Sequence, residues 1–493
     1  MLRPHNLGAS VLGIALALWG GVAAAEPGHG QVPVPILTGA SAQTGLLRVV
    51  LGLALAFVLA VLAAHPAVRR LEKRLGLTVI VSSGLPFLAL GVLFRNPSVG
   101  ILTDEVVTDL RPALEFGFGW LGFVVGMHFD VRELDRLPDR TSSVVFAESA
   151  LPFLTVAMVT AVTLLALDPT WMLSEVNGWG DAARVFARVS LRDALALGAC
   201  AAPAAPVAAA AISRGAGGTA AWLVQRITTL NDVAGVFVMA LICAYYRPAD
   251  DVSAWHLPHI AWLFVTLGLG GVFGILTYVL VRGAESEAQE MALLLGSTAI
   301  SAGMSGYLGV SPLVTCAIAG ALLTNLPYKG MARLRQTMVQ VERPLYLIFL
   351  LVAGALWDPT AWQGWLLVPV FVFARVSGKV IGAHIGKITG PAGLPDPATL
   401  GLALSPQSPI SIATIVAYVT LYRGATTAPV LSWLMTTCIG GAVLTEVVVQ
   451  VVARLRGGLT LEREPAAGSI YPAPPHDMDS LTPPPPDVHG GDR

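Results

Sequence analysis

The sequence predicts an all-α polytopic membrane protein. Of its 493 residues, 55% are hydrophobic and only 12% are charged, and the mean hydropathy is +0.70. This composition cannot supply the polar shell of a soluble globular protein. Apolar stretches long enough to cross ~30 Å of hydrocarbon as helices recur along the chain, and no series of alternating ten-residue segments indicates a barrel. The predicted fold is therefore a bundle of membrane-spanning helices.

Both ends of the chain are predicted to lie outside this bundle. Residues 1–25 resemble a secretory signal peptide, because Arg3 precedes an apolar core and three alanines precede Glu26. The alternative is an uncleaved extra helix. Residues 26–44 are predicted to be a periplasmic linker. Residues 458–493 are rich in Pro and are predicted to form a disordered cytoplasmic tail.

About thirteen membrane spans are predicted from the apolar windows and the breaks between them. They lie near 45–64, 77–94, 111–129, 142–167, 190–213, 218–246, 255–282, 290–305, 308–326, 342–357, 363–386, 396–421 and 428–453.

Basic residues predict the orientation of these spans, because Lys and Arg near helix ends are retained in the cytoplasm. They cluster in alternate connections, at 69–74, 132–140 and 329–335, and the last span is followed by Arg454 and Arg456. The opposite connections are poorer in Lys and Arg. We therefore predict a protein of the bacterial inner membrane with a periplasmic N-terminus and a cytoplasmic C-terminus.

Two segments in opposite halves of the chain share one spacing of Gly and Pro. The fifth span contains LGACAAPAAP, which ends with Pro203 and Pro206, and the twelfth contains LGLALSPQSP, which ends with Pro406 and Pro409. Each Pro removes a backbone donor and clashes with the preceding turn. Two prolines three residues apart therefore predict a helix that is broken near the middle of the membrane.

The two broken helices are predicted to be related by inversion, because the topology makes them cross the membrane in opposite directions. Unwound backbone in hydrocarbon is costly unless it lines a polar cavity. Matched breaks in inverted halves indicate the binding site of a transporter, whereas ordinary proline kinks are the alternative. The pairing predicts inverted repeats at 45–246 and 290–457, joined by a linker helix at 255–282, with the fifth and twelfth helices crossed.

Asp232 lies at the centre of the sixth predicted span. A buried carboxylate there must be protonated, or must meet a cation or a water-filled cavity. A carboxylate that holds either a proton or a cation, but not both, couples their opposite movements. We therefore predict an ion-binding site at Asp232, Asn231, Thr229 and Thr228. The alternative role for the Asp is a hydrogen bond between helices.

Three further charged residues fall inside spans and are predicted to compensate charge. Arg375 and Lys379 are one turn apart on the eleventh span, and Glu148 is on the fourth. We expect one of these two basic side chains to pair with Asp232 or to lie against a helix break. The other is expected to bond with Glu148 or to reach the membrane surface. Arg226, near the predicted cytoplasmic end of the sixth span, is also expected to reach that surface.

Other classes of function are not supported by the sequence. The spans contain no HExxH or GxSxG motif and no paired catalytic carboxylates, so an enzyme is not expected. No cofactor is expected, and no metal other than a transported cation. A net charge of -1 gives no reason to expect nucleic acid as a partner.

Three segments resemble the cation:proton antiporter superfamily, the sodium/proton and potassium/proton exchangers, over roughly 45–455. TLND at 229–232 is similar to the ion-site motif, FLLVAGALWD at 349–358 to the Phe-rich segment, and ARVSGK at 374–379 to the basic helix. The resemblance implies a monovalent cation/proton antiporter that exchanges Na+ or K+ for H+ and serves pH homeostasis. It also implies a homodimer in the lipid bilayer and alternating access of the elevator type.

The chain departs from these relatives at two places. Their first broken helix often carries Thr and Asp before its Pro, where this chain has Ala201 and Ala202. Some electroneutral relatives carry an acid where this chain has Ile227. Ligands are then expected among backbone carbonyls at the breaks, bounded by Pro203, Pro206, Pro406 and Pro409, and among the side chains of Asn231, Thr228, Thr229, Ser405, Gln407 and Ser408.

Two other transport functions remain as alternatives. A sodium symporter of the bile-acid type shares crossed broken helices, but it usually has additional polar ligands that the Ala-rich segment 199–211 lacks. A cation channel is the second alternative. Matched inverted halves and a single titratable carboxylate favour alternating access instead.

Overall fold

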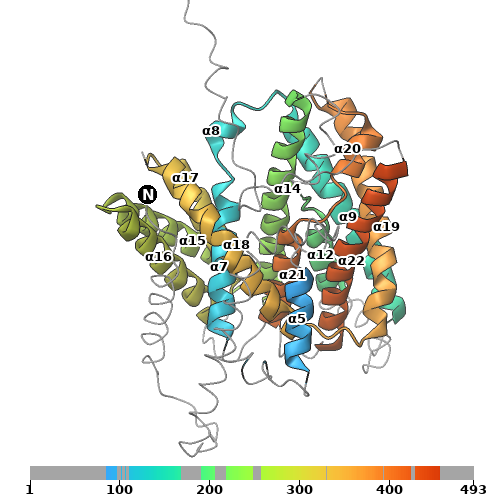
Figure 1. Cartoon of the computed structure of the whole chain (residues 1–493), viewed down its shortest axis with the longest axis horizontal. Coiled ribbons are helices and arrows are strands. Elements are labelled where there is room, and N and C mark those ends of the chain that lie inside the picture. Colours follow the sequence, from blue (N-terminus) through green and yellow to red (C-terminus); the bar gives the residue numbers. More distant parts are fainter. Residues whose placement is uncertain are drawn as a thin grey trace, which may run out of the picture.

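The computed structural model is helical in the part of the chain that it describes (Figure 1). The signal peptide, the periplasmic linker, the first span and the Pro-rich tail that the sequence predicts all lie outside this part. The described residues are 85–96, 102, 106, 110–167, 190–205, 218–247, 257–328, 330–391, 394–422 and 428–455.

The helices follow the predicted spans closely. In chain order they are α5 (Leu85–Arg95), α7 (Arg111–Met127), α8 (Val131–Leu134), α9 (Thr141–Leu167), α12 (Ser190–Ala201), α14 (Gly218–Tyr245), α15 (His259–Arg282), α16 (Glu287–Tyr307), α17 (Pro312–Asn325), α18 (Met331–Leu356), α19 (Trp362–Thr389), α20 (Pro397–Ala403), α21 (Pro409–Tyr422) and α22 (Ala428–Leu455). Within the described ranges, α9, α14, α15, α19 and α22 contain stretches long and apolar enough to cross a membrane.

One helix boundary differs from its prediction. The sequence predicts a span that starts near residue 342, whereas α18 starts at Met331. Its first turns contain Arg333 and Arg335, which were predicted to lie in a connection. These polar turns continue the helix beyond its apolar stretch, because the two arginines find acidic partners at Glu290 and Glu133. Hydrophobicity alone therefore marked the apolar part of the helix and missed its polar extension.

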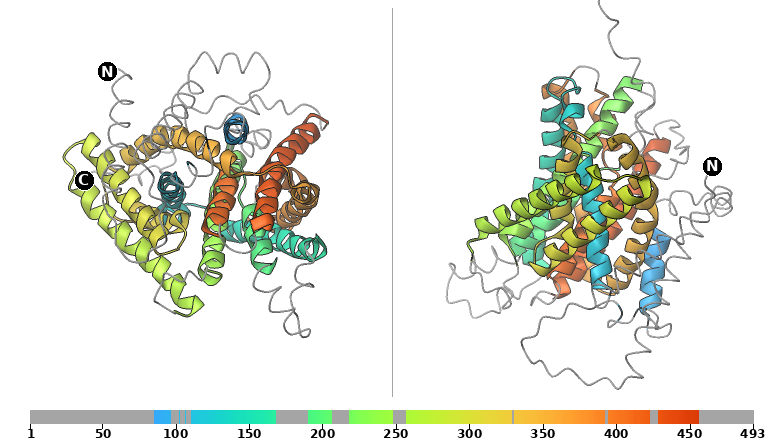
Figure 2. Two further views of the ribbon diagram at one scale, coloured as in Figure 1. Left: turned by 90° about the horizontal axis from the view of Figure 1, so that it is seen from below. Right: turned by 90° about the vertical axis from the view of Figure 1, so that its left-hand side faces the viewer.

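The helices pack into two bundles that lie side by side (Figures 1 and 2). We call the first the α9 bundle, made of α9, α12, α14, α19, α20, α21 and α22. We call the second the α7 bundle, made of α5, α7, α15, α16, α17 and α18. Each bundle combines helices from both predicted repeats. Between the bundles, α14 packs on α7, α15 and α17, and α21 packs on α7 and α17.

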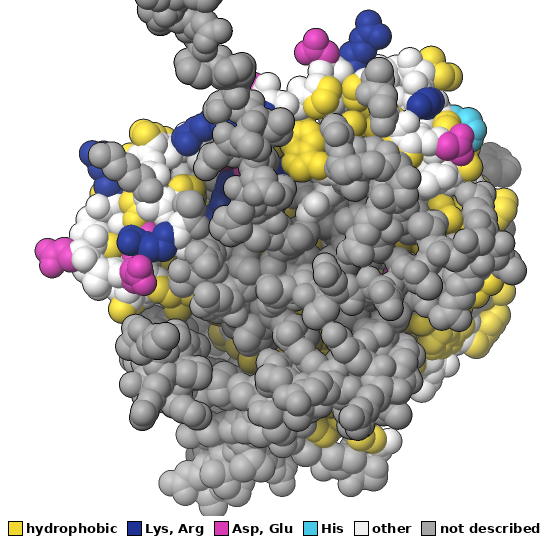
Figure 3. Space-filling view, turned by 45° about the horizontal axis from the view of Figure 1, so that its top comes forward, with side chains coloured by type: hydrophobic (Ala, Val, Ile, Leu, Met, Phe, Trp, Pro, Cys, Tyr) yellow, Lys and Arg dark blue, Asp and Glu magenta, His cyan; other side chains and the backbone are white. Residues whose placement is uncertain are grey.

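Large apolar side chains are exposed on the flanks of both bundles. Examples are Phe146 and Met158 on α9, Phe264 on α15 and Phe373 on α19. Contiguous exposed apolar surface marks contact with a membrane or another protein. In Figure 3 the visible charged side chains lie at the top and in a group on the left, whereas hydrophobic side chains gather on the right flank. This distribution suits a protein whose flanks contact lipid, as expected for a multi-pass membrane protein.

Candidate functional site

The two predicted helix breaks are present and lie against each other. The helix α12 ends at Ala201, and five non-helical residues separate α20 from α21. The backbone N–H of Ala205 donates to the carbonyl of Pro406 at 2.9 Å, and Ala204 pairs with Gln407 in an antiparallel bridge. Pro206 lies outside the described residues. The unwound segments therefore satisfy part of each other's backbone hydrogen bonding in the middle of the α9 bundle.

Arg375 of α19 is fully buried and binds the carbonyls of both breaks. Its guanidinium donates to the oxygens of Ala201 and Pro203 (2.6 Å for the latter) and to those of Ser405 (3.2 Å) and Pro406 (3.4 Å). Carbonyls at the C-terminal end of a helix lack partners and carry partial negative charge. One five-donor side chain therefore binds the last carbonyl of α12 and carbonyls of both unwound segments.

Lys379 lies one turn further along α19 and connects the first break to α9. Its Nζ donates at 2.8 Å to the carbonyls of Ala202 and Glu148. The Oε2 atom of Glu148 is 3.8 Å from the same nitrogen, and both side chains are completely buried. Of the arrangements that the sequence allows, the structure therefore has Arg375 against the breaks and Lys379 beside Glu148.

Asp232 of α14 faces the second break. It is 1% exposed, and the hydroxyl of Ser408 donates to its Oδ2 atom at 3.2 Å. Ser408 directly precedes α21, whose N-terminal end carries partial positive charge. On the other side, a Cβ added to Gly235 would lie 2.6 Å from Cγ of Pro203. The absence of a side chain at this position therefore lets α14 approach the first break.

Asn231 is held by a residue that the sequence pattern did not identify. The hydroxyl of Ser149 on α9 donates to Oδ1 of Asn231 at 2.9 Å, and both side chains are buried. This contact fixes the amide so that its NH2 group is directed away from Ser149. Ser149 follows Glu148 directly in the sequence, which is the only signal that could have found it.

The other predicted ligand side chains donate hydrogen bonds to acceptors other than Asp232. Thr228 and Thr229 both donate to the carbonyl of Gln225, one turn earlier on α14. Ser405 donates to the carbonyl of Gly401 at 2.7 Å, and the amide of Gln407 donates to Sγ of Cys438. Hydroxyl oxygens keep a lone pair after donating. Among the side chains predicted as ligands, Ser408 is the one that contacts Asp232 through a hydrogen bond given by the structure.

A second buried charge centre in the same bundle was not anticipated from the sequence. Arg192 and Asp193 at the start of α12 form an ion pair with an N–O distance of 2.7 Å. The hydroxyl of Tyr418 on α21 donates to Asp193, and the Arg192 guanidinium lies 4.5 Å from the ring centroid of Tyr422. We call these four residues the aspartate–tyrosine cluster. An adjacent Arg-Asp pair inside an apolar span was the available signal.

The candidate site therefore combines two buried basic side chains with two buried carboxylates, those of Asp232 and Glu148. Arg375 and Lys379 are bound to backbone carbonyls, and the carboxylate of Asp232 lies close to a helix N-terminus. A carboxylate in this environment can hold a proton or a small cation while the breaks keep their own hydrogen bonds. This arrangement suits reversible ion binding in the interior of a membrane protein.

Comparisons with known proteins agree with this chemistry. The family model described as "Sodium/hydrogen exchanger, transmembrane" matches residues 57–453. Among solved structures, the sodium proton antiporter MjNhaP1 from Methanocaldococcus jannaschii at pH 8 matches with a TM-score of 0.57 and 14% identity, covering 85% of this chain and 99% of that chain. At this identity the structural likeness shows the fold alone. No curated protein matched the chain.

The family model spans most of the chain, and the fold is that of an antiporter. The predicted resemblance and the all-helical polytopic fold class are thereby confirmed. The chain belongs to the sodium/hydrogen exchanger family, whose members are multi-pass membrane transporters that exchange a cation for a proton.

Proposed function

We propose that this chain exchanges Na+ or K+ for H+ across the bacterial inner membrane, and that the two ions compete for the carboxylate of Asp232. The observation that carries the proposal is the position of this carboxylate. It is buried beside Ser408 at the second break, while the nearby cations Arg375 and Lys379 hydrogen-bond to backbone carbonyls.

Electrostatics supports an ion site at this position. The C-terminal ends of α12 and α20 contribute partial negative charge, which Arg375 offsets. The N-terminal end of α21, which begins directly after Ser408, contributes partial positive charge next to Asp232. Asp232 can then release its proton in exchange for a cation. Asn231 and Ser408, together with carbonyls at the breaks, are the proposed ligands.

The proposed movement is alternating access of the elevator type. All the residues of the candidate site belong to the α9 bundle, and this bundle contacts the α7 bundle mainly through α14 and α21. A rigid displacement of the α9 bundle along the α7 bundle would carry the site from one membrane face to the other. Alternating access in transporters is largely a rigid-body movement of one helical bundle against the other. We further propose that the chain forms a homodimer, as the resemblance of its sequence motifs to the cation:proton antiporter superfamily implies.

The test is cation-induced collapse of a proton gradient in proteoliposomes. Wild type is expected to dissipate the gradient when Na+ or K+ is added, and Asp232→Asn is expected to lose at least ~100-fold of this rate, because one carboxylate supplies the exchangeable charge. Glu115→Gln is the matched control, since Glu115 is a carboxylate on α7 that pairs with Arg111 away from the breaks. Its rate should stay within about twofold of wild type.

The same vesicles separate this proposal from the two alternative functions. A sodium symporter of the bile-acid type would move Na+ without collapsing the proton gradient. A cation channel would pass current in proportion to the membrane potential. The proposal fails if wild type collapses no gradient with any monovalent cation, or if Asp232→Asn is as active as wild type.

A further inference from the structure

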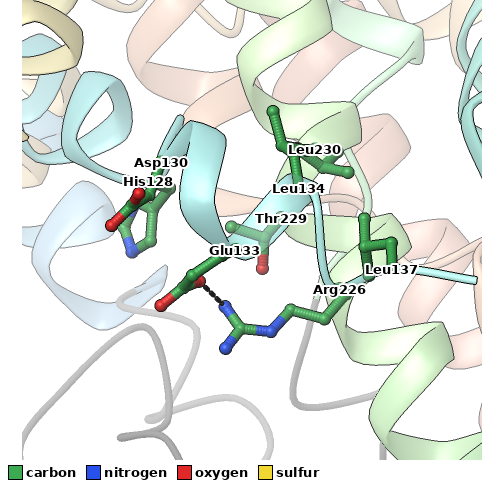
Figure 4. A pocket seen from close by; sticks show the side chains of 8 residues that line it. All are labelled: His128, Asp130, Glu133, Leu134, Leu137, Arg226, Thr229 and Leu230. Atoms are coloured by element: carbon green, nitrogen blue, oxygen red, sulfur yellow. Dashed lines mark hydrogen bonds and ion pairs between the residues drawn. The ribbon is translucent and has the colours of Figure 1, made fainter. Parts of the chain in front are cut away.

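A pocket at the α8 end of the molecule leads to the helix that carries Asp232. It is lined by residues of α8 and α14, among them Glu133, Arg226, Thr229 and Leu230 (Figure 4). Thr229 lies three residues before Asp232 on α14. Because an α-helix rises 1.5 Å per residue, this lining residue is about one turn along α14 from the residue that carries the carboxylate. This end of the molecule is the one that the sequence predicts to face the cytoplasm.

One ion pair spans the pocket. Figure 4 shows Arg226 reaching from α14 to Glu133 on α8, and the distance from its Nη1 atom to Oε2 of Glu133 is 2.5 Å. Both side chains are about one-quarter exposed, at 23% and 28%. Arg226 belongs to the α9 bundle, whereas α8 is attached to the α7 bundle. The pair therefore connects the two bundles at the mouth of the pocket.

The attachment of α8 to the α7 bundle is much stronger than its attachment to α14. Arg335 of α18 binds Glu133 at 3.2 Å, Asp130 at 3.1 Å and the hydroxyl of Thr324 at 2.8 Å. Asn325 of α17 adds two bonds, from the backbone N–H of residue 131 and to the carbonyl of residue 129. These contacts fix α8 to α17 and α18, so Glu133 stays with the α7 bundle.

The second partner of Glu133 makes the pair with Arg226 easy to separate. A buried carboxylate that loses its only cation is strongly destabilised. Glu133 keeps Arg335 when Arg226 moves away, and Arg226 is already in contact with solvent. A partly exposed ion pair of this kind has a small net stability and can therefore form and break during a transport cycle.

We propose that Arg226 and Glu133 form a gate that closes the pocket, and that the pocket is the route by which the transported cation reaches Asp232 from the α8 end. This inference rests on the proposed function for the identity of the ion. When the α9 bundle moves relative to the α7 bundle, Arg226 leaves Glu133, and the acidic side chains at the mouth are left facing the path of an incoming cation.

The first arm of the test measures accessibility and needs no transport. A Leu230→Cys reporter is labelled with a membrane-impermeant thiol reagent applied from the α8 side, with the chain lacking the reporter as background. Adding Arg226→Gln should increase the labelling rate about 3- to 10-fold. Arg333→Gln is the matched control, because Arg333 at the same end pairs with Glu290 within the α7 bundle, and it should leave the rate unchanged.

The second arm locks the gate. A chain with Glu133→Cys and Arg226→Cys is treated with a short, reducible, bifunctional thiol cross-linker in proteoliposomes. Antiport should fall at least 10-fold and return on reduction, whereas treatment with the cross-linker should not change the rate that each single-Cys variant had before treatment. The gate is overturned if the cross-linked protein transports at the uncross-linked rate, or if Arg226→Gln leaves the labelling unchanged. If wild type shows no antiport in these vesicles, the proposed function fails, and the labelling arm alone decides on the gate.

Discussion

The α9 bundle contains two buried charge centres that are built in different ways. In the aspartate–tyrosine cluster the opposite charges are neighbours, and Oδ1 of Asp193 accepts from Nε of Arg192 at 2.8 Å and from the hydroxyl of Tyr418. In the candidate site the hydrogen bonds of Arg375 and Lys379 go to backbone carbonyls. Opposite charges are in direct contact in the first centre, whereas in the second the basic side chains hydrogen-bond to backbone carbonyls and the Lys379–Glu148 pair is longer, at 3.8 Å.

This difference separates a structural role from an exchange role. The ion pair of the aspartate–tyrosine cluster would have to be broken before either residue could bind another ion, and breaking a buried pair is costly. In the candidate site the basic side chains of Arg375 and Lys379 are held by backbone carbonyls. A proton or a transported cation can therefore bind to Asp232 and leave it without displacing these side chains. We therefore expect changes in the first centre to affect stability and changes around Asp232 to affect transport.

The largest expected effect is that of removing the charge that holds both breaks. Arg375→Gln cannot serve the carbonyls of Ala201, Pro203, Ser405 and Pro406 together, and hydrogen bonds to charged groups contribute ~1.5–3 kcal/mol each. We expect a loss of stability on the order of 5 kcal/mol and loss of transport. Thermal unfolding of the purified protein in detergent checks the loss, with Arg375→Lys as the conservative variant of intermediate stability. Unfolding at the wild-type temperature would contradict the role of Arg375.

A slightly smaller loss is expected at the aspartate–tyrosine cluster. Asp193→Asn leaves Arg192 buried without its ion-pair partner, and removing one partner of a buried pair costs about 3–5 kcal/mol. The variant should unfold at lower temperature, yet the folded fraction should keep the wild-type apparent KM for the cation. A changed KM would show that this centre takes part in exchange and would remove the distinction between the two regions.

A smaller effect, seen mainly in transport, is expected at the second break. Ser408→Ala removes a hydrogen bond to Asp232 worth ~1 kcal/mol, which corresponds to about a fivefold change in the apparent KM for the cation. Because the Ser408 hydroxyl also accepts from the backbone N–H of Ile410 at 3.3 Å at the start of α21, stability should fall by about 1 kcal/mol. Ser405→Ala is the matched control, because this hydroxyl donates to the carbonyl of Gly401 in the preceding helix α20. Equal effects of the two variants on the KM would argue against direct contact with the ion site.

The smallest effect is expected at Asn231. Ser149→Ala releases the amide from α9 while leaving Asp232 and Ser408 in place. Loss of one neutral hydrogen bond of ~0.5 kcal/mol predicts about a twofold change in apparent KM, measured by the same gradient collapse. Thr163→Val, on the exposed face of α9, should leave the KM unchanged. A loss of transport as large as that of Asp232→Asn would make Asn231 an equal partner in the site.

Much of the fold was predictable because its signals are local in the sequence. Apolar stretches marked the membrane helices, and the repeated Pro spacing marked the breaks that follow Ala201 and Ala403. The cost of placing a carboxylate inside an apolar span singles out Asp232 as the ion site, and that assignment stays a prediction. The predicted start of α18 was wrong, because ion pairs with other helices support its polar first turns.

The parts that could not be predicted depend on contacts between distant residues. Ser149 and Asn231 are 82 positions apart, and Asp193 and Tyr418 are 225 apart. Nothing in either local segment specifies its partner. The sequence also could not predict which of Arg375 and Lys379 binds the breaks and which lies beside Glu148, because this depends on which carbonyls the breaks direct toward α19.

The most direct test of the central claim is proton release on cation binding to the purified protein in weakly buffered detergent solution. If Na+ or K+ competes with H+ at Asp232, wild type should release protons when the cation is added, the apparent affinity for the cation should rise with pH, and Asp232→Asn should release none. Cation binding without proton release, or equal release by Asp232→Asn, would contradict the account.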